Sequence, residues 1–444
     1  MLEKRSLRKR CVILVLLVFG LLLGAAWAQT ESVLYSFCTQ GCTDGADPYT
    51  APVVVDQKGN LYGTTYYGGV NQNNQQQCSP DGCGVAFKVT PDGKETVLYT
   101  FCTQDNCTDG ASPEAGPALD QKGNLYGTTY YGGAYDGCNP LGGYGCGVVF
   151  KLTPKGKETV LYNFCAQTNC TDGTYPSAGL IFDQKGNLYG TTITGGAIGG
   201  GVVFKLSPEG KETVLYSFCA QTNCADGAAP EAGLIFDQKG NLYGTTKTGG
   251  AHNSGQGGGV VFKLTPEGKE TVLYSFCAQT NCADGSWPVA GLVFDQKGNL
   301  YGTTAVGGAY DGCYPGGLGC GVAFKLTPEG RETVLYSFCA QINCTDGANP
   351  AAGLVFDQKG KLYGTTASGG DNNNGYCSYG GCGVVFKLTP KGKETVLHAF
   401  CAQNDCADGA SPGAGLIFGQ KGKLYGTTGN GGAYNRGVVF KLTP

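Results

Sequence analysis

Cysteine is the residue type whose spacing in this sequence points most directly to chemistry. Of the 23 cysteines, Cys11 lies within the first 28 residues and the other 22 fall into eleven close pairs. Two thiols so near in sequence can form a disulfide or contribute to a zinc site. Seven pairs recur once per repeat: Cys38-Cys42, Cys102-Cys107, Cys165-Cys170, Cys219-Cys224, Cys277-Cys282, Cys339-Cys344 and Cys401-Cys406. Four more lie in longer loops: Cys78-Cys83, Cys138-Cys146, Cys313-Cys320 and Cys377-Cys382.

Disulfides are the interpretation that the pairing favours. An even number of cysteines in local pairs behind an export signal indicates an oxidising compartment. Zinc would need four ligands per ion, so two pairs from different repeats would have to converge, and only His252 and His398 could assist. We therefore predict disulfides at all eleven pairs, no metal and no other cofactor.

Aromatic residues in the loops that differ between repeats are the predicted ligand-binding residues. Trp287 occupies a loop position that Tyr175 fills in another repeat. Flat rings beside amides and hydroxyls suit neutral sugars or a protein surface. The alternative is that these rings pack over the disulfides. The predicted set is Trp287, Tyr175, Tyr66, Tyr67, Tyr130, Tyr131, Tyr135, Tyr310 and Tyr314.

Catalytic constellations are sparse. A nucleophile needs an adjacent base and an orienting group, but His252 and His398 lie at unrelated repeat positions. His398 replaces a strand tyrosine of the other repeats, which indicates a packed strand histidine. Carboxylates from distant repeats could converge to cleave glycosides, yet nothing in the sequence distinguishes two of them. No catalytic residue is predicted.

Two series of aspartates accompany the repeats. One stands in an Asp-Gly-x-x-Pro loop, where calcium would need a denser run of oxygen ligands, so turn formation is the better interpretation. The other precedes a hairpin turn, and Gly419 interrupts it. The loop series is Asp44, Asp109, Asp172, Asp226, Asp284, Asp346 and Asp408; the hairpin series is Asp56, Asp120, Asp183, Asp237, Asp295 and Asp357.

A repeat of 54 to 64 residues positions all these side chains. Asn-Leu-Tyr-Gly-Thr-Thr occurs seven times, with Lys replacing Asn in the last two copies. In the third unit, apolar runs at 180–182, 188–192, 202–206 and 213–218 are separated by turn sequences. Four strands with no room for a helix predict an antiparallel meander.

The ends of the chain indicate how the seven sheets are arranged. Ser32–Phe37 is a fourth strand without the preceding three, and the sequence stops in a third strand at Phe440–Pro444. Joining the two completes the last sheet and removes its exposed edge. We predict an all-β, seven-bladed β-propeller of four-stranded antiparallel blades, closed by Ser32–Phe37.

The repeated motifs resemble a known family. Asp-Gln-Lys-Gly-Asn-Leu-Tyr-Gly-Thr-Thr, Gly-Val-Val-Phe-Lys-Leu-Thr-Pro and Glu-Thr-Val-Leu-Tyr-Ser-Phe together resemble the Gloeo/Verruco ("GloVer") tandem repeat of bacterial secreted proteins. The resemblance covers essentially the whole chain after residue 28. It implies a repeat-built extracellular protein, and it brings no catalytic residues. Members often carry a C-terminal surface anchor, which we do not expect here because the sequence ends at Pro444.

The N-terminus and the charge limit location and partners. A basic cluster, an apolar run over 12–23 and Ala26-Trp27-Ala28 predict a signal peptide over 1–28 and a single seven-repeat propeller domain over 29–444. An uncleaved anchor is the alternative, although the apolar run is short for a membrane span. The leader holds five of the 31 basic and one of the 34 acidic residues, which leaves a net charge of −7 and argues against nucleic acid.

The functional prediction is a secreted or periplasmic binding scaffold. Long loops braced by disulfides lose less entropy when they bind a partner, so the face that carries them is the expected ligand face. The partner would be a glycan, a cell-envelope component or an extracellular protein, with no membrane span after leader cleavage, and the protein a monomer. The alternatives are an extracellular polysaccharide-active enzyme that uses carboxylates near the propeller channel, and a purely structural surface protein.

Overall fold

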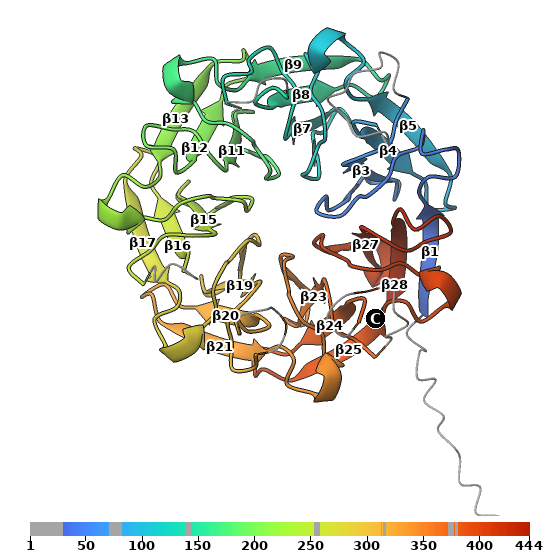
Figure 1. The fold of residues 1–444 in the computed structure, drawn as a ribbon, viewed down its shortest axis with the longest axis vertical. Helices are drawn as coiled ribbons and strands as arrows, with labels where there is room; N and C mark the ends of the chain where they lie inside the picture. The colour runs from blue at the N-terminus through green and yellow to red at the C-terminus, as the bar shows by residue number, and fades with distance from the viewer. Residues whose placement is uncertain are drawn as a thin grey trace, which may run out of the picture.

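Seven four-stranded antiparallel sheets form a closed ring in the computed structural model (Figure 1). The structure describes residues 30–70, 82–138, 144–252, 258–311, 313, 317–371, 377 and 381–444. Within these ranges there is no α-helix. The predicted seven-bladed β-propeller is thus confirmed, and the blades are numbered from 1 to 7 along the chain.

Each blade contains strands of the same four types. The innermost strands are β2 (Val54–Val55), β6 (Ala118–Leu119), β10 (Ile181–Phe182), β14 (Ile235–Phe236), β18 (Val293–Phe294), β22 (Val355–Phe356) and β26 (Ile417–Phe418). The second strands are β3 (Leu61–Thr65), β7 (Leu125–Thr129), β11 (Leu188–Thr192), β15 (Leu242–Thr246), β19 (Leu300–Thr304), β23 (Leu362–Thr366) and β27 (Leu424–Thr428). The third strands are β4 (Val85–Val89), β8 (Val148–Leu152), β12 (Val202–Leu206), β16 (Val260–Leu264), β20 (Val322–Leu326), β24 (Val384–Leu388) and β28 (Val438–Thr443). The outer strands are β5 (Glu95–Thr100), β9 (Glu158–Asn163), β13 (Glu212–Ser217), β17 (Glu270–Ser275), β21 (Glu332–Ser337), β25 (Glu394–Ala399) and, in blade 7, β1 (Thr30–Ser36).

The N-terminal strand completes the last blade. In blade 7 the strand order is β1-β28-β27-β26, and β1 pairs with β28 from Thr30↔Thr443 to Ser36↔Val438. Figure 1 shows the blue β1 lying along the red β28. The strand begins at Thr30, two residues earlier than the sequence predicted, and this pairing leaves β28 with a partner on both edges.

Phenylalanines fill the spaces between neighbouring blades. A residue on each third strand meets, edge to face, a phenylalanine that follows the outer strand of the preceding blade, with ring centroids 5.0 to 5.1 Å apart. Both rings of each pair are buried, and such edge-to-face contacts add to the energy of burial. The pairs are Phe37–Phe87, Phe101–Phe150, Phe164–Phe204, Phe218–Phe262, Phe276–Phe324, Phe338–Phe386 and Phe400–Phe440.

A second circle of contacts surrounds the central channel. The first threonine of each Leu-Tyr-Gly-Thr-Thr donates its hydroxyl to a backbone carbonyl of the next blade, at 2.9 to 3.3 Å. The circle closes where Thr427 of blade 7 reaches Ala51 of blade 1. Gly116 lies so close to blade 1 that a Cβ there would overlap the Pro52 carbonyl oxygen. The repeated motif therefore joins blades, and each buried hydroxyl and carbonyl in the circle is satisfied by its partner.

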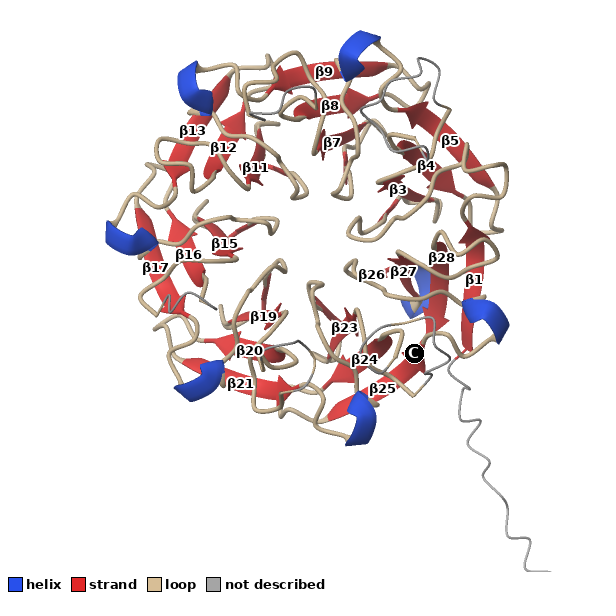
Figure 2. Ribbon diagram, in the orientation of Figure 1, coloured by secondary structure: helices blue, strands red, loops and turns tan. Residues whose placement is uncertain are grey.

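Short 3₁₀ helices lie mostly at the rim of the ring, as Figure 2 shows. Six follow outer strands and end at the second cysteine of a pair: η1 (Asp105–Cys107), η2 (Thr168–Cys170), η3 (Thr222–Cys224), η4 (Thr280–Cys282), η5 (Ile342–Cys344) and η6 (Asn404–Cys406). The seventh, η7 (Gln420–Gly422), forms the hairpin turn where Gly419 replaces the usual aspartate. Elsewhere that aspartate accepts backbone N–H bonds in the turn, as Asp56 does from Lys58 and Asn60.

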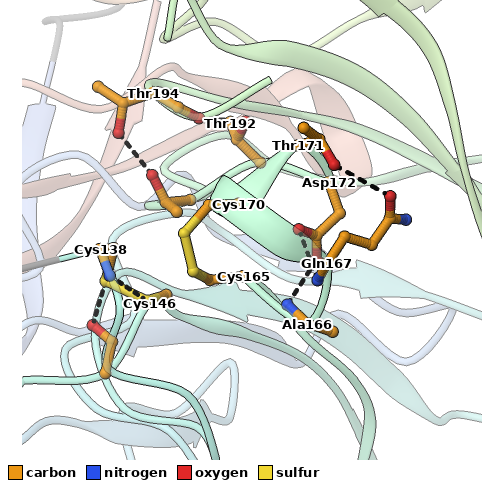
Figure 3. Close-up of a disulfide and its surroundings, with 12 residues drawn as sticks. Cys138, Cys146, Cys165, Ala166, Gln167, Cys170, Thr171, Asp172, Thr192 and Thr194 are labelled. Carbon is orange, nitrogen blue, oxygen red and sulfur yellow. Dashed lines mark hydrogen bonds between the residues drawn. A yellow bond between two sulfur atoms is a disulfide. The ribbon is translucent and has the colours of Figure 1, made fainter. Parts of the chain in front are cut away.

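Ten of the eleven cysteine pairs are disulfides in the structure, and the remaining pair lies partly outside the described residues because Cys78 does. Where a long loop carries an extra pair, it lies against the pair that follows the same blade's outer strand, as Cys138-Cys146 and Cys165-Cys170 do in Figure 3. In blade 5 all four sulfurs lie within 4.8 Å of one another. We expected that two cysteine pairs could converge on a zinc ion only if they came from different repeats. This expectation is wrong, because the long loop and the segment after the outer strand lie on one face of the same blade and bring two pairs together. In blades 3 and 4 the outer-strand pair forms a disulfide without a second pair, so it does not depend on shared metal binding.

The aspartates of the Asp-Gly-x-x-Pro loops hold the start of each 3₁₀ segment. Asp172 accepts hydrogen bonds from the N–H groups of Ala166 and Gln167, the first of them at 2.9 Å (Figure 3), and from the hydroxyl of Tyr162. In blade 6, His398 takes the tyrosine's place and its Nε2 lies 3.0 Å from Asp408 Oδ2. This is the packed strand histidine that the sequence predicted. The aspartate organises the loop, as a turn-forming residue does.

Candidate functional site

A cavity of about 750 Å³ occupies the mouth of the central channel, on the face that carries the disulfides. Its wall contains one ring of seven residues, the position that follows proline in each Asp-Gly-x-x-Pro loop. These residues are Tyr49, Glu114, Ser177, Glu231, Val289, Ala351 and Gly413. The proline before this position and the Ala-Gly that usually comes after it are the same in most repeats, whereas the residue type at the position itself differs from blade to blade. We call this cavity the channel-mouth site.

Side chains of blades 4 and 5 form an ion pair beside an indole ring at the cavity wall. Lys247, the first residue after β15, forms an ion pair with Glu231, with Nζ 3.0 Å from Oε1. The same ammonium lies 5.7 Å from the centre of the Trp287 ring. Both ionic side chains are partly buried, at 34% and 22% exposure. A cation held between a carboxylate and an indole face is restricted to one position.

Two side-chain oxygens at the wall have no hydrogen-bond partner among the described residues. They are Glu114 Oε2 and Ser177 Oγ, both inaccessible to solvent. Burial and the negative charge of Glu231 raise the pKa of Glu114 to about 7, and Lys247 opposes that shift. The carboxyl of Glu114 therefore exists in both protonation states near neutral pH. Unpartnered buried oxygens are costly, and a ligand or a water molecule that supplied the missing bonds would offset that cost.

Tyrosines of blades 1 to 3 surround Glu114. Tyr66 and Tyr130 are the first residues after β3 and β7, and both line the cavity with Tyr131. Tyr130 stacks on Tyr175 at 4.9 Å, and Tyr131 lies edge-on to both neighbours. Burial, followed by nearby groups that include Glu114, raises the pKa of Tyr66 and Tyr130 well above the usual value. These phenols remain neutral hydrogen-bond donors at every physiological pH.

The opposite arc of the mouth is small and apolar. Val289, Ala351 and Gly413 take the ring position in blades 5 to 7. Tyr49 covers part of this arc, because its ring occupies the space where Gly413 or Gly429 would carry a Cβ. One half of the site is thus polar and aromatic and the other half is shallow, which leaves room for a ligand against the polar arc.

The structure brings together some of the aromatic residues that the sequence predicted, and separates others. Tyr66, Tyr130 and Tyr131 line the channel-mouth site, Tyr175 and Tyr67 pack directly behind them, and Trp287 lies under Lys247. Tyr135 and Tyr310 are exposed at 44% and 42% and lie outside the cavity lining. Tyr314 lies outside the described residues. Five of the nine predicted residues, Tyr66, Tyr67, Tyr130, Tyr131 and Tyr175, thus lie in or beside the cavity wall rather than at the tips of the long loops.

Sequence reasoning missed Glu114, Ser177, Glu231 and Lys247. A signal was present, because each occupies a position that varies while its neighbours repeat. The residue after the loop proline runs through six types in seven repeats, and the residue after Leu-Tyr-Gly-Thr-Thr is Lys only in blade 4. Alignment of the repeats with attention to single variable positions, rather than to whole loops, would have selected them.

The repeat of this chain matches a known protein family. The model of the Gloeobacter/Verrucomicrobia repeat matches residues 23–255, 74–314, 135–377 and 256–444, which together cover the propeller. The chain belongs to this family. The Gloeobacter/Verrucomicrobia repeat thus corresponds to propeller blades, and the resemblance seen in the sequence is confirmed. No curated protein matches the chain by sequence.

Solved structures with a similar backbone arrangement have low sequence identity to this member of the Gloeobacter/Verrucomicrobia family. A candidate gluconolactonase is 14% identical over 93% of this chain and 91% of its own, with a TM-score of 0.43. A candidate glucose dehydrogenase from Thermus thermophilus is 16% identical over 94% and 100%, with a TM-score of 0.42. A protein of unknown function from Dyadobacter fermentans is 11% identical over 82% and 96%, with a TM-score of 0.43. Such values carry no information about the activity of this chain.

Proposed function

We propose that this protein is a secreted glycan-binding propeller whose ligand occupies the channel-mouth site. The observation that carries the proposal is the pair of unpartnered buried oxygens, Glu114 Oε2 and Ser177 Oγ, in the wall of a cavity that tyrosines flank. A rotation of these side chains toward the cavity would let a ligand hydrogen-bond to both oxygens and recover their lost hydration.

The chemistry of the wall favours a sugar. Sugar hydroxyls can donate to the Glu114 carboxylate and accept from Ser177 or a tyrosine, whereas an ion could do only one of these. Glu231 and Lys247 neutralise each other, so the site has no large net charge that would select an anion or a cation. The apolar faces of pyranose rings suit the aromatic rings of Tyr66 and Tyr130.

The location proposed for the protein is outside the cytoplasm. The ten disulfides are consistent with an oxidising compartment, and residues 1–28 have the form of a signal peptide that precedes a domain over 29–444. Among the residues that the structure describes, no helix is long and apolar enough to cross a membrane. Glycans of cell envelopes and matrices are available in such a compartment.

A binding experiment with the full propeller tests this proposal. The protein is titrated calorimetrically with soluble β-glucan, xylan, chitosan oligosaccharides, starch fragments and peptidoglycan fragments. We expect saturable binding of at least one of them. Glu114→Ala should weaken that binding by roughly 10- to 100-fold, because a hydrogen bond to a charged group is worth about 1.5–3 kcal/mol.

The matched control is Glu209→Ala, which removes an exposed carboxylate from a turn on the opposite face. It should leave the affinity unchanged. If no probe binds, or if Glu114→Ala binds as tightly as the parent chain, the channel mouth is not the ligand site.

A further inference from the structure

Two glutamates of the channel-mouth site occupy equivalent positions in different surroundings. Glu114 and Glu231 both follow the proline of their loops, in blades 2 and 4, with Ser177 of blade 3 between them in the ring. They are the only acidic side chains in the lining of the described cavity. The sequence could not distinguish these two acids from the other glutamates, but the structure places them in one cavity.

Glu114 has the environment of a carboxylic acid. Its Oε2 is buried without a partner, and the phenols of Tyr66, Tyr130 and Tyr131 lie around it. Because burial raises its pKa to about 7, a large fraction of Glu114 holds a proton at neutral pH. A carboxyl group in such surroundings can give its proton to a leaving oxygen.

Glu231 has the environment of a carboxylate. Its Oε1 accepts a hydrogen bond from the Lys247 ammonium at 3.0 Å, and the centre of the Trp287 ring lies 5.7 Å from that ammonium. A carboxylate in this position can accept a proton from water. Pairs of carboxyl groups whose surroundings favour opposite protonation states are the usual signature of acid and base roles.

We propose that the channel-mouth site hydrolyses glycosidic bonds, with Glu114 as the general acid and Glu231 as the general base. This inference rests on the proposed binding of glycans at the same site and adds a reaction to it. Glycoside cleavage needs two such carboxyl groups, one on each side of the scissile bond. Glu114 and Glu231 line the same cavity from blades 2 and 4, with blade 3 between them.

The reaction consumes one molecule of water. Glu231 takes a proton from the water, whose oxygen forms a bond to the anomeric carbon. The bond between the anomeric carbon and the glycosidic oxygen breaks, its electron pair stays on that oxygen, and Glu114 supplies the proton that makes it a hydroxyl. Glu231 then returns its proton to solvent and Glu114 takes one up, which restores both groups.

The charged and titratable groups that face the two acids set the pH dependence. They are Lys247 and the three tyrosines, and burial raises the pKa of each tyrosine above its usual value. Activity should decrease as the pH rises through about 7, because Glu114 loses the proton that it must donate.

The test measures new reducing ends in the five glycan probes named above, together with calorimetric binding of each. We expect at least one bound glycan to be cleaved. Glu114→Gln and Glu231→Gln should each lower kcat by at least about 100-fold while the affinity stays within about threefold, because the amide retains hydrogen bonding but cannot transfer the proton. The activity that remains in Glu114→Gln should also lose its decrease above pH 7.

The control variant Glu267→Gln changes an exposed turn residue of blade 4 and should keep full activity. A glycan that binds at the site and stays intact in prolonged incubation overturns the hydrolysis but leaves the binding function standing. Equal loss of binding and cleavage in Glu114→Gln would also contradict the acid role. If none of the probes binds, the proposed binding function fails, and the proposed hydrolysis fails with it.

Discussion

Deletion of residues 32–37 should open the ring, lower the melting temperature by more than any single substitution and drive association. The deleted segment supplies most of β1, the strand that covers the edge of β28. The deletion also removes Phe37, which is fully buried against Phe87 of blade 1 and thereby connects blade 7 to blade 1. Loss of one buried phenylalanine alone costs about 3–5 kcal/mol, and the deletion adds the loss of a whole strand pairing.

The free edge of β28 explains the expected association. Without β1, the outer edge of β28 offers its N–H and C=O groups to any other chain. Removal of Tyr35 also leaves Asp44 buried without the hydroxyl that donates to it at 2.6 Å. Thermal unfolding and size-exclusion chromatography measure the two effects.

A synthetic peptide of residues 29–40 provides the control for this deletion. Added in excess, it should restore much of the lost melting temperature, because it can pair with β28 again. A second comparison is Phe37→Ala in the intact chain, which should destabilise the protein without causing association. A deletion variant that melts at the parent temperature and stays monomeric would contradict closure by β1.

The second large expected effect is a decrease in stability as the pH rises from 4.5 to 8. One glutamate near the start of each outer strand has a buried Oε1 without a partner in the described residues. For six of the seven, burial, and then the charge of an aspartate from the preceding blade, raises the pKa to about 7, or about 8 for Glu332. For Glu31 burial also dominates and the value is about 7, with His398 opposing the shift. The set is Glu31, Glu95, Glu158, Glu212, Glu270, Glu332 and Glu394.

The sign follows from proton linkage. A carboxyl group whose pKa is higher in the folded chain than its ordinary value of 4.5 contributes its full stabilisation below pH 4.5, and that contribution is lost progressively as the pH rises from 4.5 through about 7. Five aspartates of the hairpin series have lowered pKa values and act in the opposite sense at lower pH: Asp56, Asp120, Asp183, Asp237 and Asp295. Burial raises the pKa of Asp56, but hydrogen bonds from Asn60, Tyr62 and Lys58 outweigh it and hold the pKa below the usual value, so that stability falls only when these groups are protonated. Maximum stability is therefore expected near pH 4, below the ordinary pKa of the seven glutamates.

Thermal unfolding at a series of pH values measures this effect. We expect the melting temperature to fall by about 5 °C or more between pH 4.5 and pH 8. Replacement of all seven glutamates by glutamine should remove most of the slope, because glutamine fits the same space without a charge. The exposed Glu209→Gln is the matched control and should leave the slope intact. A melting temperature that rises with pH in the parent chain would be opposite to this account.

Much of the fold could be predicted from the sequence because each blade repeats the same pattern of apolar runs and turn residues. Turn residues separate four apolar runs, and no run is long enough for a helix. The orphan strand at residues 32–37 reveals closure without any long-range information. The threonine bonds between blades, such as Thr427 to Ala51, could not be anticipated because they join residues 376 positions apart through the curvature of the ring.

The candidate site was predictable only in part. Tyr66, Tyr130 and Tyr131 were selected as loop aromatics, and the structure places them at the channel mouth. Glu114 and Glu231 were not, because a glutamate gains its chemical character from what surrounds it. The burial of Glu114 and the ion pair of Glu231 with Lys247 arise from side chains of different blades. The exposed Tyr135 and Tyr310 show the converse, since an aromatic residue in a long loop need not face the site.

The fluorescence of Trp287 provides the most direct test that the channel mouth is the ligand site. With Trp27→Phe in the chain, Trp287 is the single indole, and its ring lies 5.7 Å from the Lys247 ammonium at the cavity wall. A glycan that binds at the site should change the emission saturably, with the same dissociation constant as calorimetry gives, and Ser177→Ala should weaken both together. A glycan that binds by calorimetry while the emission of Trp287 stays constant would show that the ligand binds elsewhere.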